Sequence, residues 1–135
     1  MNIFTYGTLM FNQVWRQVVE GNYKSKPGIL FGYKRRALKG EIHPCLIKGS
    51  PGNKLEGIIY FNISDTDMQT LDRFEGPEYK RVKETCLLQN GAKVETETYV
   101  WIGNLESVSS EPWDAERFEK EGIHLFIRRY KEFIN

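Results

Sequence analysis

The residue best suited to acid–base chemistry is the last one of a short predicted helix. This helix begins after Ser64 and is stopped by a Gly-Pro pair. Met68 and Leu71 share one face of this helix, and the same face extends to Glu75. A carboxylate therefore occupies a position where the pattern calls for an apolar side chain. Burial and the negative end of the helix dipole both raise the pKa of such a group, which makes it a usable general base near neutral pH. The alternative is a frayed helix end with its carboxylate in water, so Glu75 is a candidate catalytic residue.

A second candidate is the connection between a predicted strand at residues 2–5 and the first predicted helix. It consists of Tyr6, Gly7, Thr8, Leu9 and Met10, with Phe11 next to it. The backbone N–H groups of such a loop, together with the following helix terminus, can bind an anion. The loop has one glycine and no lysine, unlike a phosphate-binding P-loop, so a simple turn is an equal alternative.

Helical periodicity predicts three segments that must position these groups. The first has Asn12 as its N-cap and Gly21 just beyond its end, and its apolar stripe comprises Phe11, Val14, Trp15, Val18 and Val19. The second has Ser64 as its N-cap, with carboxylates in its first turn. The third opens at residues 110–113, is interrupted at Gly122 and continues into an aromatic tail at residues 126–133.

Strands account for most of the remaining chain. Residues 28–39 indicate one long strand or two, with a candidate bulge at Gly32, and residues 42–48 and 55–63 indicate two more, the last of them central. Period-two segments on either side of a Gln-Asn-Gly turn at residues 89–91 predict a hairpin, followed by a loop at residues 103–109. Without a regular β-α alternation, the predicted fold is α+β. It is a small, mixed, strongly curved β-sheet or barrel with flanking helices, in a single domain over residues 1–135.

Composition excludes several classes of partner. The chain has 135 residues, of which 27% are charged, and its net charge of +1 favours neither a nucleic acid nor a membrane surface. The basic run at residues 34–36 is interpreted as a solvated strand edge. The start of the chain has neither a basic region nor a long apolar stretch, which predicts a cytoplasmic protein, and we expect a monomer or a weak homodimer.

Other reactive side chains are few. Cys45 and Cys86 lie in apolar strand-like runs, which favours inert buried thiols over a nucleophile, a disulfide or a metal site, and no cofactor is expected. His43 precedes a proline beside a predicted strand and is a candidate acid–base group, although a structural role is the commoner outcome for such a histidine.

Four stretches together resemble the γ-glutamylcyclotransferase-like superfamily, and most closely its avirulence-induced-gene-two-like branch. They are residues 6–10 (Tyr-Gly-Thr-Leu-Met), residues 71–81 (Leu-Asp-Arg-Phe-Glu-Gly-Pro-Glu-Tyr-Lys-Arg), residues 98–101 (Thr-Tyr-Val-Trp) and residues 111–114 (Glu-Pro-Trp-Asp). The resemblance runs from about Met1 to about Phe118.

The resemblance implies a small mixed β-barrel with flanking helices and a γ-glutamyl small-molecule substrate. By this likeness, the loop at residues 6–10 holds the glutamyl part of the substrate largely through backbone groups, and Glu75 is the general base and acid. The α-amine of the substrate attacks its own γ-carbonyl, which forms 5-oxoproline and expels an amine or amino acid. Tyr79 and Arg81 either line the pocket or pack over the helix end, and Tyr79 is counted among the candidate substrate-binding residues.

Two other functions stay open at this point. A non-catalytic protein of the same fold would bind a small carboxylate-bearing metabolite, although a nearby carboxylate such as Glu75 does not help to bind an anion. A purely structural protein would present the aromatic tail at residues 126–133 to a partner, whereas packing of this tail over the barrel is the alternative.

Overall fold

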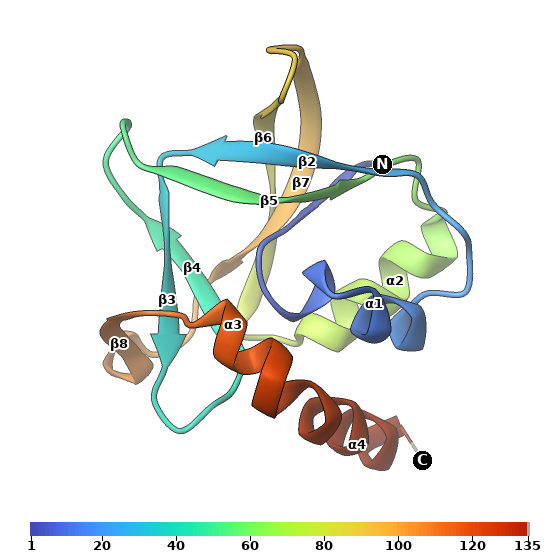
Figure 1. Cartoon of the computed structure of the whole chain (residues 1–135), viewed down its shortest axis with the longest axis vertical. Coiled ribbons are helices and arrows are strands. Elements are labelled where there is room, and N and C mark those ends of the chain that lie inside the picture. Colours follow the sequence, from blue (N-terminus) through green and yellow to red (C-terminus); the bar gives the residue numbers. More distant parts are fainter. Residues whose placement is uncertain (135) are drawn as a thin grey trace.

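The computed structural model describes residues 1–134, and the side chains of residues 1–132. Five strands form a closed barrel in the order β1-β5-β2-β6-β7 (Figure 1). Their bounds are β1 Ile3–Thr5, β2 Ser25–Phe31, β5 Lys54–Tyr60, β6 Tyr79–Leu88 and β7 Lys93–Trp101. Neighbouring strands are antiparallel except β1 and β7, which are parallel and close the barrel. The predicted mixed, curved sheet is confirmed.

A second sheet of three strands lies against the barrel in the order β4-β3-β8. Its strands are β3 Tyr33–Leu38, β4 Pro44–Lys48 and β8 Val108–Pro112. The stretch at residues 28–39 is thus two strands. Gly32 is the link between β2 and β3 and not a bulge within one strand, and its φ of 87° is a conformation that glycine adopts readily.

The β8 strand corrects the sequence prediction of a loop at residues 103–109 and a helical start at residue 110. A short helical turn occupies Leu105–Ser107, and β8 then pairs with β3 through Arg36 opposite Pro112 and Leu38 opposite Val108. Ser-Ser-Glu-Pro is a weak strand former, so this strand owes its existence to a partner distant in sequence.

Two helices cover one side of the barrel (Figure 1). Helix α1 spans Asn12–Val18 with Phe11 as its N-cap, so the prediction of Asn12 as N-cap was one residue late. Its C-cap is Val19, and Gly21 lies two residues further along. The Gly21 N–H donates to the buried carboxylate of Asp67 at 3.0 Å. Asp67 belongs to helix α2, Asp65–Glu75, so this contact ties the end of α1 to α2.

Helix α2 begins and ends as the sequence predicts. The Ser64 hydroxyl oxygen accepts a hydrogen bond from the Asp67 N–H at 3.2 Å, which confirms the N-cap. Gly76 follows the last helical residue with φ of 85°, a left-handed conformation that stops the helix before Pro77.

The C-terminal region is a continuous helical segment that begins after Asp114, whose carboxylate accepts from the Arg117 N–H at 3.0 Å. Helix α3, Ala115–Arg117, passes through a π-helical turn at Phe118–Gly122 into α4, Ile123–Ile134. The predicted interruption at Gly122 corresponds to the end of this π-helical turn, although the chain stays helical through it. Phe126, Ile127 and Tyr130 pack partly buried against the core, and the side chain of Phe133 lies outside the described residues.

Packing inside the barrel fixes β1 and hence the loop that follows it. Phe4, Leu30 and Ile59 are fully buried there. Gly57 allows β1 to approach β5, because a Cβ atom at this position would lie 2.2 Å from the carbonyl oxygen of Thr5. Both cysteine thiols are free and buried, as predicted.

Candidate active site

A cavity of about 510 Å³ opens where the barrel, the second sheet and the helices meet. Its walls come from β1 and the following loop, from residues 41–43 and the start of β4, from the end of α2 and the start of β6, from Tyr99 of β7, and from α4. Cavities of roughly 300–1,000 Å³ are typical of small-molecule sites. The cavity is therefore where the sequence-predicted site residues have to be located.

Glu75 is the last residue of α2 and lines this cavity. Met68 and Leu71, on the same helix face, are buried in the core, as the periodicity predicted. Burial, and secondly the charge of Asp72, raise the pKa of Glu75 to about 8. A carboxyl group with such a pKa exists in both protonation states near neutral pH, so it can accept a proton and return it.

The loop at residues 6–11 is divided between the cavity and the core. Tyr6, Gly7, Thr8 and Leu9 line the cavity, whereas Met10 and Phe11 pack against the core cluster behind it. The Met10 and Phe11 N–H groups are also occupied, because they donate to the carbonyls of Gly7 at 3.0 Å and Thr8 at 3.2 Å.

Three other backbone N–H groups of this loop have different surroundings. Among residues 1–132, no hydrogen bond is donated by the backbone N–H groups of Gly7, Thr8 and Leu9. They are available to a ligand oxygen. The single glycine has a packing reason, because a Cβ atom on Gly7 would lie 2.7 Å from the Pro44 ring.

Arg35 fastens this loop and corrects the interpretation of residues 34–36 as a solvated edge. Strand β3 is the central strand of the second sheet, and the Arg35 guanidinium is half-buried. Its Nη1 donates to the Tyr6 carbonyl oxygen at 2.8 Å, and the guanidinium lies 5.2 Å from the ring centroid of Trp113. A charge-assisted hydrogen bond thus holds the loop where it leaves β1.

Three tyrosines surround the carboxylate. The Tyr6 hydroxyl donates to the Tyr99 carbonyl at 2.7 Å, and the Tyr79 hydroxyl donates to the Pro44 carbonyl at 2.7 Å. All three rings line the cavity. Burial, and then the charge of Glu75, raise the pKa values of Tyr6 and Tyr79, so these phenols stay neutral donors at physiological pH.

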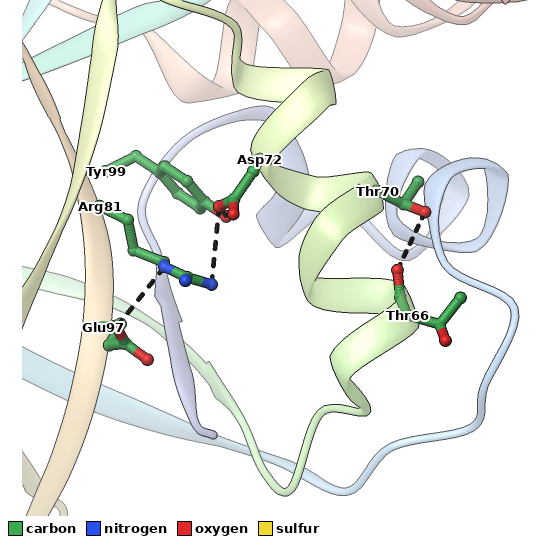
Figure 2. Close-up of polar contacts among 6 residues, drawn as sticks. All are labelled: Thr66, Thr70, Asp72, Arg81, Glu97 and Tyr99. Atoms are coloured by element: carbon green, nitrogen blue, oxygen red, sulfur yellow. Dashed lines mark hydrogen bonds and ion pairs between the residues drawn. The ribbon is translucent and has the colours of Figure 1, made fainter.

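A polar network stands behind Glu75. The Tyr99 hydroxyl donates to Asp72 Oδ1 at 2.7 Å, and Figure 2 shows Arg81 between Asp72, at 3.6 Å, and Glu97, at 3.5 Å. Arg81 does not line the main cavity. Of the two predicted positions for this residue, in the pocket or over the helix end, it therefore takes the second. This network holds a negative charge next to Glu75.

His43 lines the cavity on the side of the second sheet. Its Nδ1 lies 3.8 Å from a Glu41 carboxylate oxygen, and its ring contacts Phe126 edge-on with centroids 6.4 Å apart. Burial lowers its pKa more than the neighbouring carboxylates raise it, so the ring is neutral at pH 7.

Metal and membrane binding were also considered. Within the described part of the chain, no group of three or more His, Cys, Asp or Glu side chains has the arrangement of a metal site. The described helices include none that is long and apolar enough to cross a membrane.

The sequence that forms this cavity matches a known protein family. Residues 3–115 match the family model described as gamma-glutamyl cyclotransferase, AIG2-like. The chain belongs to this family. The match covers the cavity loop, Glu75 and β7, and it ends where α3 begins.

Relatives of this AIG2-like chain align over nearly all of it. Protein AIG2 C of Arabidopsis thaliana is 29% identical over 134 residues, which cover 98% of this chain and 81% of the relative. AIG2-like protein D of the same plant is 30% identical, with coverages of 98% and 88%. An Arabidopsis thaliana protein solved in solution is 28% identical and superposes with a TM-score of 0.71, over 98% of this chain and 81% of that one.

A solved gamma-glutamyl cyclotransferase has the same fold at low identity. It is 16% identical and superposes with a TM-score of 0.69, covering 97% of this chain and 86% of that chain. Both the family and the barrel fold expected from the sequence motifs are therefore confirmed.

Sequence reasoning missed several residues around the site of this AIG2-like protein. Arg35 was overlooked because its partner, the Tyr6 carbonyl, comes from a distant segment. The wall formed by Phe126, Arg129 and Tyr130 was overlooked as well. The apolar stripe of the C-terminal helix predicted that it packs, without indicating that it packs beside the cavity.

Proposed function

We propose that the protein is a γ-glutamyl cyclotransferase, an enzyme that releases 5-oxoproline from a γ-glutamyl amide, peptide or amine by intramolecular aminoacyl transfer. The observation that carries this proposal is Glu75: a carboxyl group in the wall of a cavity of about 510 Å³, with its pKa raised to about 8. Membership of the γ-glutamyl cyclotransferase, AIG2-like family supports the same reaction class.

The proposed reaction needs one residue that moves protons. The substrate's α-ammonium gives a proton to the Glu75 carboxylate, and the resulting amine attacks the γ-carbonyl carbon. The ring nitrogen loses a second proton to water as the tetrahedral intermediate forms. Glu75 then returns its proton to the leaving nitrogen, the carbon–nitrogen bond to that nitrogen breaks, and the departing amine takes up a proton from water. Positioned proton transfer of this kind contributes roughly 10²–10⁴-fold to a rate.

The loop supplies the electrostatic partner for the other end of the substrate. The N–H groups of Gly7, Thr8 and Leu9 have no acceptor among residues 1–132, and all three residues line the cavity. They can hold the α-carboxylate or polarise the γ-carbonyl oxygen, and each role uses fixed donors that need no reorganisation. Folding the substrate back between this loop and Glu75 brings amine and carbonyl together, which supplies the positional advantage of an intramolecular reaction.

The proposal is tested by measuring 5-oxoproline release from a panel of γ-glutamyl dipeptides, glutathione and γ-glutamylamines. Glu75→Gln keeps the size of the side chain but cannot accept the proton, so we expect turnover to fall by roughly 10²–10⁴-fold while the fold stays intact by circular dichroism. The matched control is Glu56→Gln on the exposed face of β5, which should retain full activity.

Two results would contradict the proposal. Unchanged turnover in Glu75→Gln would exclude the proposed proton transfer. If no compound of the panel gives product but small carboxylates raise the melting temperature, the protein is a binding protein of the same fold.

A further inference from the structure

Part of the cavity wall comes from a segment of the chain that the family model does not include. The match ends at residue 115, yet Phe126, Arg129 and Tyr130 of α4 line the cavity. Figure 1 shows α4 continuing from α3 below the barrel. A ligand bound in the cavity would therefore meet α4 as well as β1 and its loop.

The wall is aromatic. Phe74 of α2 meets Phe126 edge-on with ring centroids 5.8 Å apart, and it meets Tyr130 in the same way at 5.3 Å. All three rings are only partly buried and all line the cavity. Edge-to-face contacts stabilise aromatic pairs, and rings that are only partly buried keep surface that a further apolar group can cover.

Two arginines line the cavity together with these rings. Arg73 precedes Phe74, Arg129 precedes Tyr130, and both arginines line the cavity. No carboxylate of residues 1–132 forms an ion pair with either guanidinium. Of the three acidic lining residues, Glu75 follows Phe74 at the end of α2, whereas Glu41 and Glu78 lie near His43.

We propose that Phe74, Phe126 and Tyr130, with Arg73 and Arg129, form the leaving-group subsite of the cavity. It would favour γ-glutamyl dipeptides whose second residue has an aromatic or bulky apolar side chain and a free α-carboxylate. The rings cover the side chain, and the arginines attract the carboxylate. This inference rests on the proposed cyclotransferase activity and adds the class of amino acid that is expelled.

Three substrates separate the two halves of the subsite. γ-Glutamylphenylalanine has both ring and carboxylate, γ-glutamylalanine lacks the ring, and γ-glutamylphenethylamine lacks the carboxylate. We expect kcat/KM for γ-glutamylphenylalanine to exceed that for γ-glutamylalanine by roughly 3- to 10-fold, from aromatic contact. It should exceed that for γ-glutamylphenethylamine by about 2- to 5-fold at low salt, because exposed ion pairs are weak and screened.

Variants then assign the preference to α4. Phe126→Ala should reduce the phenylalanine-to-alanine ratio toward one, and Arg129→Gln should reduce the ratio of γ-glutamylphenylalanine to γ-glutamylphenethylamine. The controls are Leu125→Ala and Arg128→Gln, exposed neighbours on α4 that do not line the cavity, and both ratios should keep their wild-type values in them. A ratio of two kcat/KM values does not depend on the fraction of folded enzyme, so partial unfolding of a variant does not obscure the result.

The outcomes distinguish this inference from the function on which it rests. Equal turnover of all three substrates, or ratios that Phe126→Ala and Arg129→Gln leave unchanged, would overturn the subsite while the cyclotransferase activity stands. Absence of 5-oxoproline from every substrate would overturn the proposed function, and the inference with it.

Discussion

Replacing Asp72 with asparagine tests why the pKa of Glu75 is raised. Asp72 is three residues before Glu75 on α2, and its charge is the second cause of that shift, after burial. Asparagine keeps the oxygen that accepts the Tyr99 hydroxyl at 2.7 Å, so the substitution removes the charge and preserves the shape of the network. We expect the pKa of Glu75 to fall below about 8 in Asp72→Asn.

The size of this fall follows from Coulomb's law. Side chains three residues apart on a helix are separated by about 5–6 Å at their Cβ atoms. Two unit charges about 6 Å apart interact by roughly 2.8 kcal/mol at an effective dielectric constant of about 20, and by roughly 0.7 kcal/mol in water. Because the Asp72 side chain is 43% exposed and faces Arg81 at 3.6 Å, the lower part of this range applies. A decrease of about 0.5 to 1 in the pKa corresponds to roughly 0.7–1.4 kcal/mol.

The consequence is measurable in two ways. The ionised fraction of Glu75 at pH 7 should rise from about one tenth to between about a quarter and a half, and the acidic limb of kcat/KM should move to lower pH. A carbon-13 NMR titration of the glutamate carboxyl groups reports the pKa directly, with the Glu75 signal assigned by its loss in Glu75→Gln.

The matched control is Asp65→Asn, which removes the same charge from the first turn of the same helix. Ten residues of helix span about 15 Å, beyond the Debye length of about 8–10 Å in physiological salt, so the pKa of Glu75 should not change. An unchanged pKa in Asp72→Asn would refute the contribution of Asp72. A fall to the usual value of a glutamate would refute the larger part that we assign to burial.

Three further predictions concern stability and the loop. The pKa of Glu75 in the folded protein lies above the ordinary value of 4.5, so ionisation of Glu75 destabilises the fold as pH rises toward about 8. Glu75→Gln should therefore raise the free energy of unfolding by about 2–4 kcal/mol at pH 9 and change it little at pH 4. Urea unfolding at the two pH values measures this difference. Arg35→Met removes a charged donor from the Tyr6 carbonyl, so it should lower the free energy of unfolding by about 1.5–3 kcal/mol and raise KM. If Arg35 contributes to stability alone, KM stays unchanged. Gly57→Ala forces a Cβ atom to 2.2 Å from a carbonyl of β1 and should lower the melting temperature, while Gly52→Ala, with no atom within 4 Å, should have no steric cost.

The fold was predictable where the signal is local. Ser64 and Gly76 mark the two ends of α2, and the structure has the helix between them. Strand β8 was not predictable, because Val108–Pro112 becomes a strand only through pairing with β3, which lies about seventy residues earlier in the chain. The π-helical form of the turn before α4 was likewise not predictable, since a glycine usually weakens a helix. In the structure, Gly122 packs tightly against Phe118 within this turn.

The site divides in the same way. Glu75 could be located from one helix face, because a charged residue that continues a buried apolar stripe contradicts the local pattern, and such contradictions concentrate at functional sites. Arg35 contradicts nothing locally, because a basic residue on a strand is unremarkable until its partner in the loop after β1 is known. Met10 and Phe11 were grouped with the loop by proximity in sequence, whereas the short helical turn at Thr8–Met10 takes them away from the cavity.

Two parts of the chain, the barrel segment and helix α4, meet at the cavity. The segment at residues 3–115 carries Glu75 and the loop, both fixed by the closed barrel and by contacts such as that of Arg35 with the Tyr6 carbonyl. Helix α4 contributes Phe126, Arg129 and Tyr130 to the lining, and none of them belongs to the barrel. If proton transfer depends on Glu75 and the loop, and leaving-group choice depends in part on α4, substitutions in α4 should alter ratios of kcat/KM between substrates and leave the pKa of Glu75 unchanged. A change in that pKa in Phe126→Ala would show that the two parts are not independent.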